Sequence, residues 1–340
     1  MRDSMRKHGS SSPSKTIAGS ARAAMLILAA LAALPAAQQE TPQTSGTTLK
    51  VTTQVVNVYA VVKDKKGHPV PDLNIDAFEL TEDNVPQQIK YYSRETDTPL
   101  TMGILVDTSP SQGRVLRIEQ EEAKEFLRQV LRPKDMAFVL HFDVETELLQ
   151  DFTGDLRLLS RAIDGTVING GAQGVLPSPL PTGDTGGATH LYDAIYLSSR
   201  ELLKNEVGRK VLIMLTDGED QGSKVKQNGA LEAAQKSDVI IYSVAIIDRA
   251  FYWGQGFGFG GDAALRKLSD ETGGRVVQVD RARDTRAAFQ EIANELRTQY
   301  LLGYTPANKK QDGAFRKIRV KVRDGSYKVQ ARRGYYAPKE

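Results

Sequence analysis

The feature that most constrains the fold is a regular alternation of apolar runs and amphipathic segments between about residues 100 and 296. Five runs have the continuous apolar character of strands buried on both faces of a sheet: 101–106, 136–142, 211–215, 239–247 and 276–279. Five segments have the spacing of amphipathic helices: 114–130, 191–203, 230–236, 262–272 and 285–296. This alternation predicts an α/β fold, with a Rossmann-like, mostly parallel sheet and helices on both faces.

Both flanks of this region instead have the period-two alternation of β-strands. In residues 49–98, short strands surround two turns. In residues 299–340, two alternating segments surround Asp324-Gly325, a dipeptide that favours a two-residue hairpin. Each flank is too short to bury a core of its own. We therefore expect the two flanks to pack together as a small β-sandwich-like module beside an α/β domain at 99–298.

The N-terminus has the pattern of an export signal. An uncharged run at 23–34 follows a basic stretch and precedes small residues, as in secretory signal peptides. It is shorter than the roughly 20 residues that span a membrane. We predict a signal peptide at 1–37, cleaved or kept as an anchor, and a linker at 38–48. The mature protein is then periplasmic or extracellular and has no membrane span.

Composition excludes several kinds of site. The chain has no cysteine, which removes disulfides, thiolate metal sites and cysteine nucleophiles. The net charge is +3, but residues 299–340 carry eleven Lys or Arg against three Asp or Glu. These basic residues alternate with apolar ones, which is typical of paired strands with one solvent-exposed face. We therefore expect no nucleic-acid partner.

Oxygen-bearing side chains occur where predicted strands end. Asp107, Ser109 and Ser111 follow the first strand of the α/β region, Asp217 follows the strand at its centre, and Thr189 precedes a predicted helix. Ligands of open α/β sheets bind at the carboxyl ends of the strands. Two carboxylates and three hydroxyls suit a hard cation such as Mg²⁺ or Mn²⁺. With only two charged ligands, such an ion could accept a Glu or Asp carboxylate of a protein partner.

In order, spacing and position, these five residues resemble the metal-ion-dependent adhesion site (MIDAS) of von Willebrand factor type A (VWA) domains. The resemblance covers about residues 98–298. It implies that the three hydroxyls bind Mg²⁺ or Mn²⁺ directly, that the two carboxylates bind directly or through water, and that the domain engages protein ligands. Four flanking segments resemble a bacterial VWFA-related family common in acidobacteria: DLNIDAFELTED, QYLLGYTP, FRKIRVKV and ARRGYYAP.

A glycine-rich segment offers a competing interpretation. Residues 256–261 match the GxGxxG pattern of dinucleotide-binding loops, and Asp280 follows about 20 residues later. However, about eight residues separate the preceding strand from the first glycine, where a tight turn should begin at once. We favour a surface loop at 251–261 whose aromatic side chains could contact a partner.

Enzymatic activity is not expected, because no G-x-S-x-G elbow, Cys/His pair or general base accompanies the predicted ion. Asp193 faces the same side of its helix as Thr189 and is either a supporting acid or an ordinary solvated one. His190 is interpreted as a rim or packing residue. Two alternatives stay open: a metal-free structural envelope protein and, less favoured, a metal-assisted hydrolase.

Overall fold

The computed structural model describes residues 54–94, 98–168, 189–246, 261–279 and 284–339. The predicted signal peptide, the linker and nearly all of the glycine-rich loop lie outside the described residues. Residues 52–340 cluster as one compact unit. Within the described ranges, no helix combines the length and the apolar character needed to cross a membrane.

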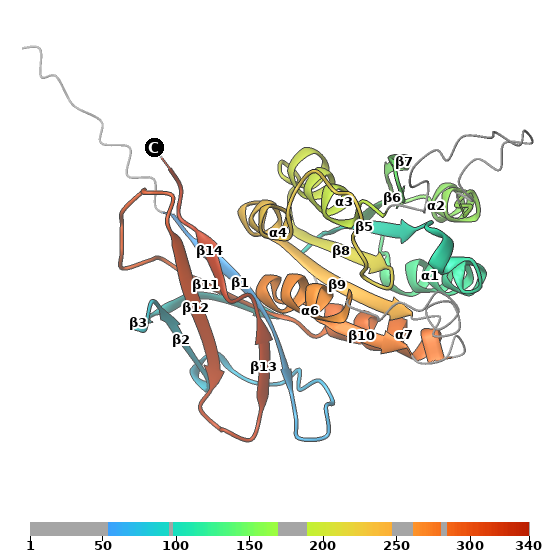
Figure 1. The fold of residues 1–340 in the computed structure, drawn as a ribbon. Coiled ribbons are helices and arrows are strands. Elements are labelled where there is room, and N and C mark those ends of the chain that lie inside the picture. Colours follow the sequence, from blue (N-terminus) through green and yellow to red (C-terminus); the bar gives the residue numbers. More distant parts are fainter. Residues whose placement is uncertain (1–53, 95–97, 169–188, 247–260, 280–283, 340) are drawn as a thin grey trace, which may run out of the picture. The chain divides into compact units, whose positions relative to one another are not determined.

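A six-stranded sheet forms the centre of the α/β part (Figure 1). Its strands, in spatial order, are β10 (Val276–Val279), β9 (Val239–Ile246), β8 (Arg209–Leu215), β5 (Leu100–Asp107), β6 (Met136–Phe142) and β7 (Thr146–Thr153). All neighbours are parallel except the antiparallel pair β6–β7. The chain winds outward from β5 on one side and from β8 on the other, so its winding direction reverses between these two strands.

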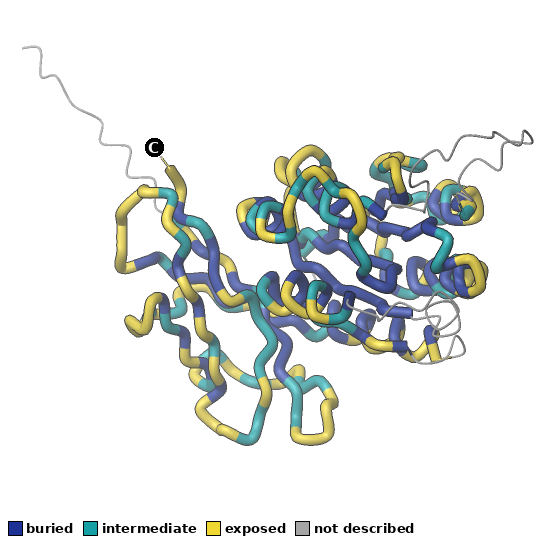
Figure 2. The backbone as a smooth tube through the Cα atoms, viewed as in Figure 1, coloured by how far each residue is buried: buried dark blue, intermediate teal, exposed yellow. Residues whose placement is uncertain are grey.

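Helices cover both faces of this sheet, as predicted from the sequence. On one face lie α1 (Leu116–Val130), α2 (Leu156–Asp164) and α7 (Thr285–Arg297). On the other lie α3 (Leu191–Leu197), its π-helical continuation Ser198–Leu203, α4 (Gln227–Lys236) and α6 (Gly261–Thr272). Figure 2 shows the strands buried between helices whose outer sides are exposed. Helix α2 was not predicted, although Asp155 at its start accepts a hydrogen bond from Arg157 N in the manner of an N-cap.

The strands of the two flanks form two four-stranded sheets. One has the order β13-β1-β11-β4 and the other β14-β12-β2-β3. Their bounds are β1 Val56–Lys63, β2 Phe78–Glu82, β3 Val85–Gln87, β4 Ile89–Arg94, β11 Tyr300–Tyr304, β12 Phe315–Val322, β13 Lys328–Ala331 and β14 Gly334–Tyr336. Each sheet combines strands from both flanks, and one apolar cluster joins the two sheets. The predicted β module made of both flanks is therefore confirmed.

The expected hairpin at Asp324-Gly325 does not form. Strand β12 pairs with β2 and β14, whereas β13 pairs with β1 in the other sheet. The two-residue turn of a hairpin requires positive φ angles, and Gly325 does not have one. Asp83 and Asn84 do, with φ of 49° and 66°, and they connect the true hairpin β2–β3. After β12 the chain therefore crosses from one sheet to the other. Both sheets contribute apolar side chains to the core between them.

Candidate metal centre

The loop that follows β5 begins with a buried carboxylate. Asp107 is 0% exposed and is the last residue of this strand. Ser109 donates its backbone N–H to Asp107 Oδ1 over 2.9 Å, and the hydroxyls of Ser109 and Ser111 are 3.0 Å apart. Residues Pro110–Gln112 form a single 3₁₀ turn that leads into α1, and Pro110, with its fixed φ, suits the start of such a turn. The turn therefore holds both serine hydroxyls next to the carboxylate.

The loop that follows β8 meets this turn. Thr216 donates its hydroxyl to Asp107 Oδ2 over 2.6 Å. Gln112 donates its side-chain amide to Asp217 Oδ2 over 2.9 Å and to Ser111 Oγ over 3.4 Å. Asp217 is 1% exposed. Hydrogen bonds through Gln112 and Thr216 thus connect four of the five predicted ligands at the point where the winding of the sheet reverses.

The residue after Asp217 must be a glycine. Gly218 has φ of +88°, and a Cβ added there would lie 2.6 Å from Leu265 Cγ and 2.9 Å from Gly261 O. Its N–H is donated to Thr216 Oγ1 over 3.0 Å. A residue with a side chain would therefore strain the backbone and collide with the start of α6.

Thr189 reaches the same edge of the sheet through its backbone. It exchanges two backbone hydrogen bonds with Gln221, of 3.2 and 2.8 Å, in the segment that follows β8. His190, at the N-cap of α3, donates its N–H to Asp143 O, which follows β6, over 2.7 Å. Thr189 is 5% exposed, and its hydroxyl forms no hydrogen bond with the other four side chains within the described ranges.

The acid Asp193 has a structural role in the loop that follows Asp217. Its two carboxylate oxygens accept the backbone N–H groups of Lys224 and Val225 over 3.0 and 2.8 Å. Asp193 therefore helps to hold the segment that positions Thr189. Of the two roles that the sequence allows for Asp193, a supporting acid and an ordinary solvated acid, these two hydrogen bonds correspond to the first.

The electrostatics of the centre favour a cation. Burial, and secondly the negative charge of Asp217, raise the pKa of Asp107 from 3.8 to about 7, although the Ser109 and Thr216 hydrogen bonds lower it in part. Within the described ranges, no three His, Asp or Glu side chains lie close enough to hold a metal ion by themselves. An ion here would therefore need the hydroxyls as well as the carboxylates.

Two residues that bond to the predicted ligands, Gln112 and Thr216, were not identified from the sequence, and neither was the buried acid Glu119 on α1. Glu119 is 0% exposed on α1, and neither of its carboxylate oxygens has a hydrogen-bond partner in the described part of the chain. The same is true of Gln112 Oε1. Buried acceptors without donors are rare in native proteins, so these atoms fit a centre that holds a cation. A sequence signal did exist, because Glu119 lies on the apolar stripe formed by Leu116, Ala123, Phe126, Leu127 and Val130.

A chain of polar groups beside the centre connects β5 to β6. Thr108 Oγ1 donates to Asp143 Oδ2 over 2.7 Å and lies 3.0 Å from His141 Nδ1, while His141 Nε2 lies 3.2 Å from Glu147 Oε2. The order Thr–His–Glu is that of a nucleophile, a base and an acid. However, Thr108 is 0% exposed, so its hydroxyl is not presented to a substrate.

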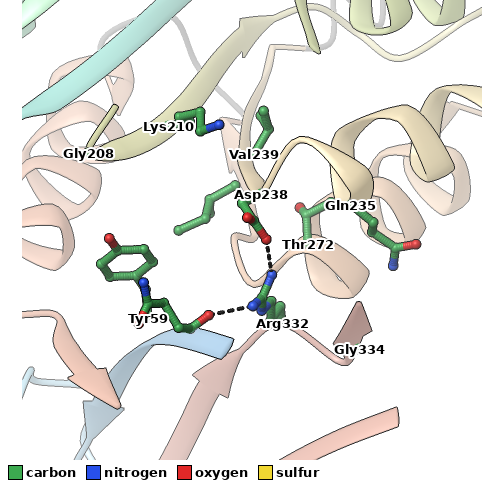
Figure 3. Close-up of a pocket in the computed structure, with 11 residues that line it drawn as sticks. Tyr59, Gly208, Lys210, Gln235, Asp238, Val239, Thr272, Arg332 and Gly334 are labelled. Carbon is green, nitrogen blue, oxygen red and sulfur yellow. Dashed lines mark hydrogen bonds and ion pairs between the residues drawn. The ribbon is translucent and has the colours of Figure 1, made fainter. Parts of the chain in front are cut away.

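A separate cavity of about 80 Å³ contains none of the predicted ligands (Figure 3). Tyr59, Lys210, Asp238 and Arg332 are among the residues that line it. Arg332 donates to Asp238 and to the backbone oxygen of Asn57, so the guanidinium and carboxylate of this cavity neutralise each other.

Comparison with known proteins shows that a segment of the α/β part matches a domain family. Residues 181–294 match the family model of the von Willebrand factor type A domain, a segment that contains Thr189 and Asp217. The chain therefore contains a VWA domain, and its mostly parallel sheet with helices on both faces is the expected fold. No curated protein matches the chain.

Several solved structures are similar to this chain at low identity. Proximal thread matrix protein 1 from the mussel byssus is 14% identical, with 64% of this chain and 51% of that chain covered and a TM-score of 0.48. A further structure of the same mussel protein has a zinc-occupied MIDAS motif. A von Willebrand factor type A protein from Catenulispora acidiphila is 12% identical, with 77% and 73% covered and a TM-score of 0.46. The chain spans about half the length of the mussel protein.

Proposed function

We propose that this chain is an exported binding protein, which uses a divalent ion, Mg²⁺ or Mn²⁺, to bind a Glu or Asp side chain of a protein partner. The observation that carries the proposal is the meeting of two buried carboxylates, Asp107 and Asp217, with the hydroxyls of Ser109 and Ser111. These side chains come from two different strand ends and are connected by hydrogen bonds. The donor set consists of oxygen atoms, as hard divalent cations prefer.

The residues of the centre would have different roles in holding such an ion. Thr216 donates a hydrogen bond to one oxygen of Asp107, and Gln112 donates one to an oxygen of Asp217, so these neutral groups help to keep each carboxylate in its orientation. A bound divalent ion would carry positive charge that the carboxylate of a protein partner could bind and neutralise. Ser109 and Ser111 are neutral, so they leave that charge uncompensated. Because the carboxylates are buried, their attraction for a cation is screened less than it would be in water.

Binding, rather than catalysis, is the activity that we propose. The nearest arrangement that resembles catalytic machinery ends in the buried hydroxyl of Thr108. Export through the N-terminal signal places the protein in the periplasm or outside the cell, where its partners would also be found. We thus propose that the exported protein binds its partner through a metal ion.

The first test is metal binding itself. We expect calorimetry to show binding of Mn²⁺ and Mg²⁺ to the wild type, and Asp217→Ala to weaken it by about 100-fold or more, because one of the two charged ligands is lost. The matched control is Asp72→Ala, whose side chain is 80% exposed in the β module. A folded wild type that binds neither ion at millimolar concentration would contradict the proposal and favour the metal-free structural alternative.

The second test concerns the partner. The wild type, immobilised with Mg²⁺, should retain proteins from an envelope extract and release them when a chelator is added. Asp217→Ala should retain none of them, and converting the contacted Glu or Asp of a retained protein to Gln or Asn should abolish its binding. Retention that is unchanged in chelator would show that the contact does not need the ion.

A further inference from the structure

We propose that Glu119 is a positioning residue of the metal centre, whose buried carboxylate serves the ion through its negative charge and through intervening water. This inference rests on the proposed function, because it concerns the same ion. It changes the composition of the centre, which then contains three carboxylates instead of two. The added charge would strengthen the hold on the cation.

The first support is the condition of the Glu119 side chain. It is fully buried on α1, and both carboxylate oxygens have no hydrogen-bond partner in the described part of the chain. Acidic side chains are almost never fully buried unless they are paired. An unpaired buried carboxylate destabilises a protein, so its presence calls for a cation, a proton or water.

The second support is where this side chain lies. Side chains of a helix tilt towards its N-terminus, and α1 begins at Leu116, separated by three residues from the Pro110–Gln112 turn that follows Ser109 and contains Ser111. The charges that act on Glu119 are those of Asp107 and Asp217. Burial, followed by these two charges, raises the pKa of Glu119 well above its ordinary value. Glu119 therefore belongs electrostatically to the predicted ligands.

The third support is the kind of atom that lacks a partner. Gln112 Oε1, from the residue that connects Asp217 to Ser111, is also buried without a donor. In the described part of the chain, the unpartnered atoms of Glu119 and Gln112 are therefore all acceptors, and acceptors of this kind can be satisfied by a cation or by the donors of bound water. Since no three acidic side chains among the residues that the structure describes converge closely enough to hold an ion by themselves, water is the fitting link from Glu119 to the ion.

A purely structural role makes a different prediction. If Glu119 only serves the fold as a neutral acid, replacing it should change stability and leave metal affinity unchanged. If it serves the ion, Glu119→Gln should weaken Mn²⁺ binding and should not lower the unfolding temperature measured in chelator. The variant removes a charge that is unfavourable without metal and useful with it.

The experiment is Mn²⁺ calorimetry together with thermal unfolding in chelator, on the full chain. We expect Glu119→Gln to raise the dissociation constant about 10- to 100-fold, the usual effect of losing a supporting residue of a metal site. The matched control is Glu121→Gln on the same helix, where the side chain is 63% exposed and paired with Lys124. It should leave both the affinity and the unfolding temperature unchanged.

Two results would overturn the inference. The first is a folded Glu119→Gln protein whose Mn²⁺ affinity stays within about threefold of the wild type. If Asp217→Ala still loses the ion, the proposed function survives that result; if the wild type binds no Mn²⁺, both fail. If the Gln variant does not fold, Glu119→Met serves in the same assays. The second is a crystal structure of the Mn²⁺-loaded wild type in which Glu119 bonds only to protein groups, without water between it and the ion.

Discussion

At the scale of single residues, the centre is defined by two buried carboxylates whose negative charges act on each other. Asp107 and Asp217 are each almost completely buried, and the neutral side chains of Thr216 and Gln112 donate hydrogen bonds to them. Neutral donors orient a carboxylate but do not remove the repulsion between two of them. This arrangement stores unfavourable electrostatic energy that a cation can release, which is why metal binding should stabilise the fold.

The pH dependence of stability provides a test of this idea. The carboxyl of Asp107 has a pKa of about 7 in the folded protein and 3.8 as a reference for the unfolded chain, because burial and Asp217 disfavour its charge. Between these values the folded state binds more protons, so the contribution of Asp107 to stability is lost as the pH rises from about 4 to 7. In chelator, the wild type should therefore lose stability relative to Asp107→Asn over this range, by at most about 4 kcal/mol.

Thermal and urea unfolding of both proteins from pH 4 to 8 measures this difference. Saturating Mn²⁺ should abolish the relative loss in the wild type, because the ion takes the place of the proton. Parallel stability curves for the two proteins in chelator would show that Asp107 does not carry the predicted pKa.

At the scale of elements, the centre depends on how two strands end. Strand β5 ends at Asp107, and the turn after it returns Ser109 and Ser111 to the carboxylate. Strand β8 ends two residues before Asp217, and Gly218 then allows the chain to pass under α6. Because β5 and β8 are parallel neighbours, their carboxyl ends lie at one edge, and short turns are enough to bring the ligands together.

The glycine turn can be tested with a matched pair of substitutions. Both Gly218 and Gly67 have positive φ, of +88° and +89°, but an added Cβ meets atoms of α6 at Gly218 and nothing within 4 Å at Gly67. Gly67→Ala should therefore cost only backbone strain of about 1–2 kcal/mol. Gly218→Ala should cost about 2–4 kcal/mol, because overpacking is added to the strain.

Urea unfolding gives these two stabilities, and calorimetry gives the affinities for Mn²⁺. Only Gly218→Ala should weaken Mn²⁺ binding, since the collision moves Asp217. Equal losses of affinity in the two variants would mean that the turn does not position the ligand.

At the scale of the whole molecule, the α/β part is inserted between two strands that lie side by side. The chain leaves the β module through β4 and returns through β11, and these strands pair with each other, Tyr92 opposite Leu302. Neither flank could form its sheets alone, because β1 pairs with β11 and β13, and β2 pairs with β12. The β module therefore requires both ends of the described chain.

A buried acid joins the two parts at this scale. Glu295 on α7 is 2% exposed, and its Oε1 accepts hydrogen bonds from Lys63 of β1 and from Arg275, each over 2.6 Å. Glu295→Gln should destabilise the protein by about 2 kcal/mol, because two partly buried cations lose their negative partner. Urea unfolding measures this loss.

The matched control is Glu291→Gln on the same helix, where the side chain is 60% exposed and also contacts Arg275. It should cost less than about 1 kcal/mol, as exposed ion pairs do. A similar cost for both variants would mean that the buried acid adds nothing to the connection of α7 with β1.

Most of the order of strands and helices, with helix α2 as an exception, and the presence of polar side chains at the ends of β5 and β8 followed from the sequence alone. Both are local properties: a buried parallel strand is apolar along its length, and a helix is apolar on one stripe. The same local reasoning identified the residues of the candidate centre, and the structure brings them to one edge, with four of them connected by hydrogen bonds.

Only the tertiary structure decided which segments meet. A period of two shows which side of a strand is buried but not which sheet it joins, so β12 and β13 were expected to pair with each other and instead belong to different sheets. Likewise, the role of an acid on an apolar stripe depends on which residues the helix packs against in the folded protein. We assign Glu119 to the centre because, in the folded protein, the charges of Asp107 and Asp217 both act on it, and Asp217 lies 98 residues away in the sequence, a separation that no local pattern spans.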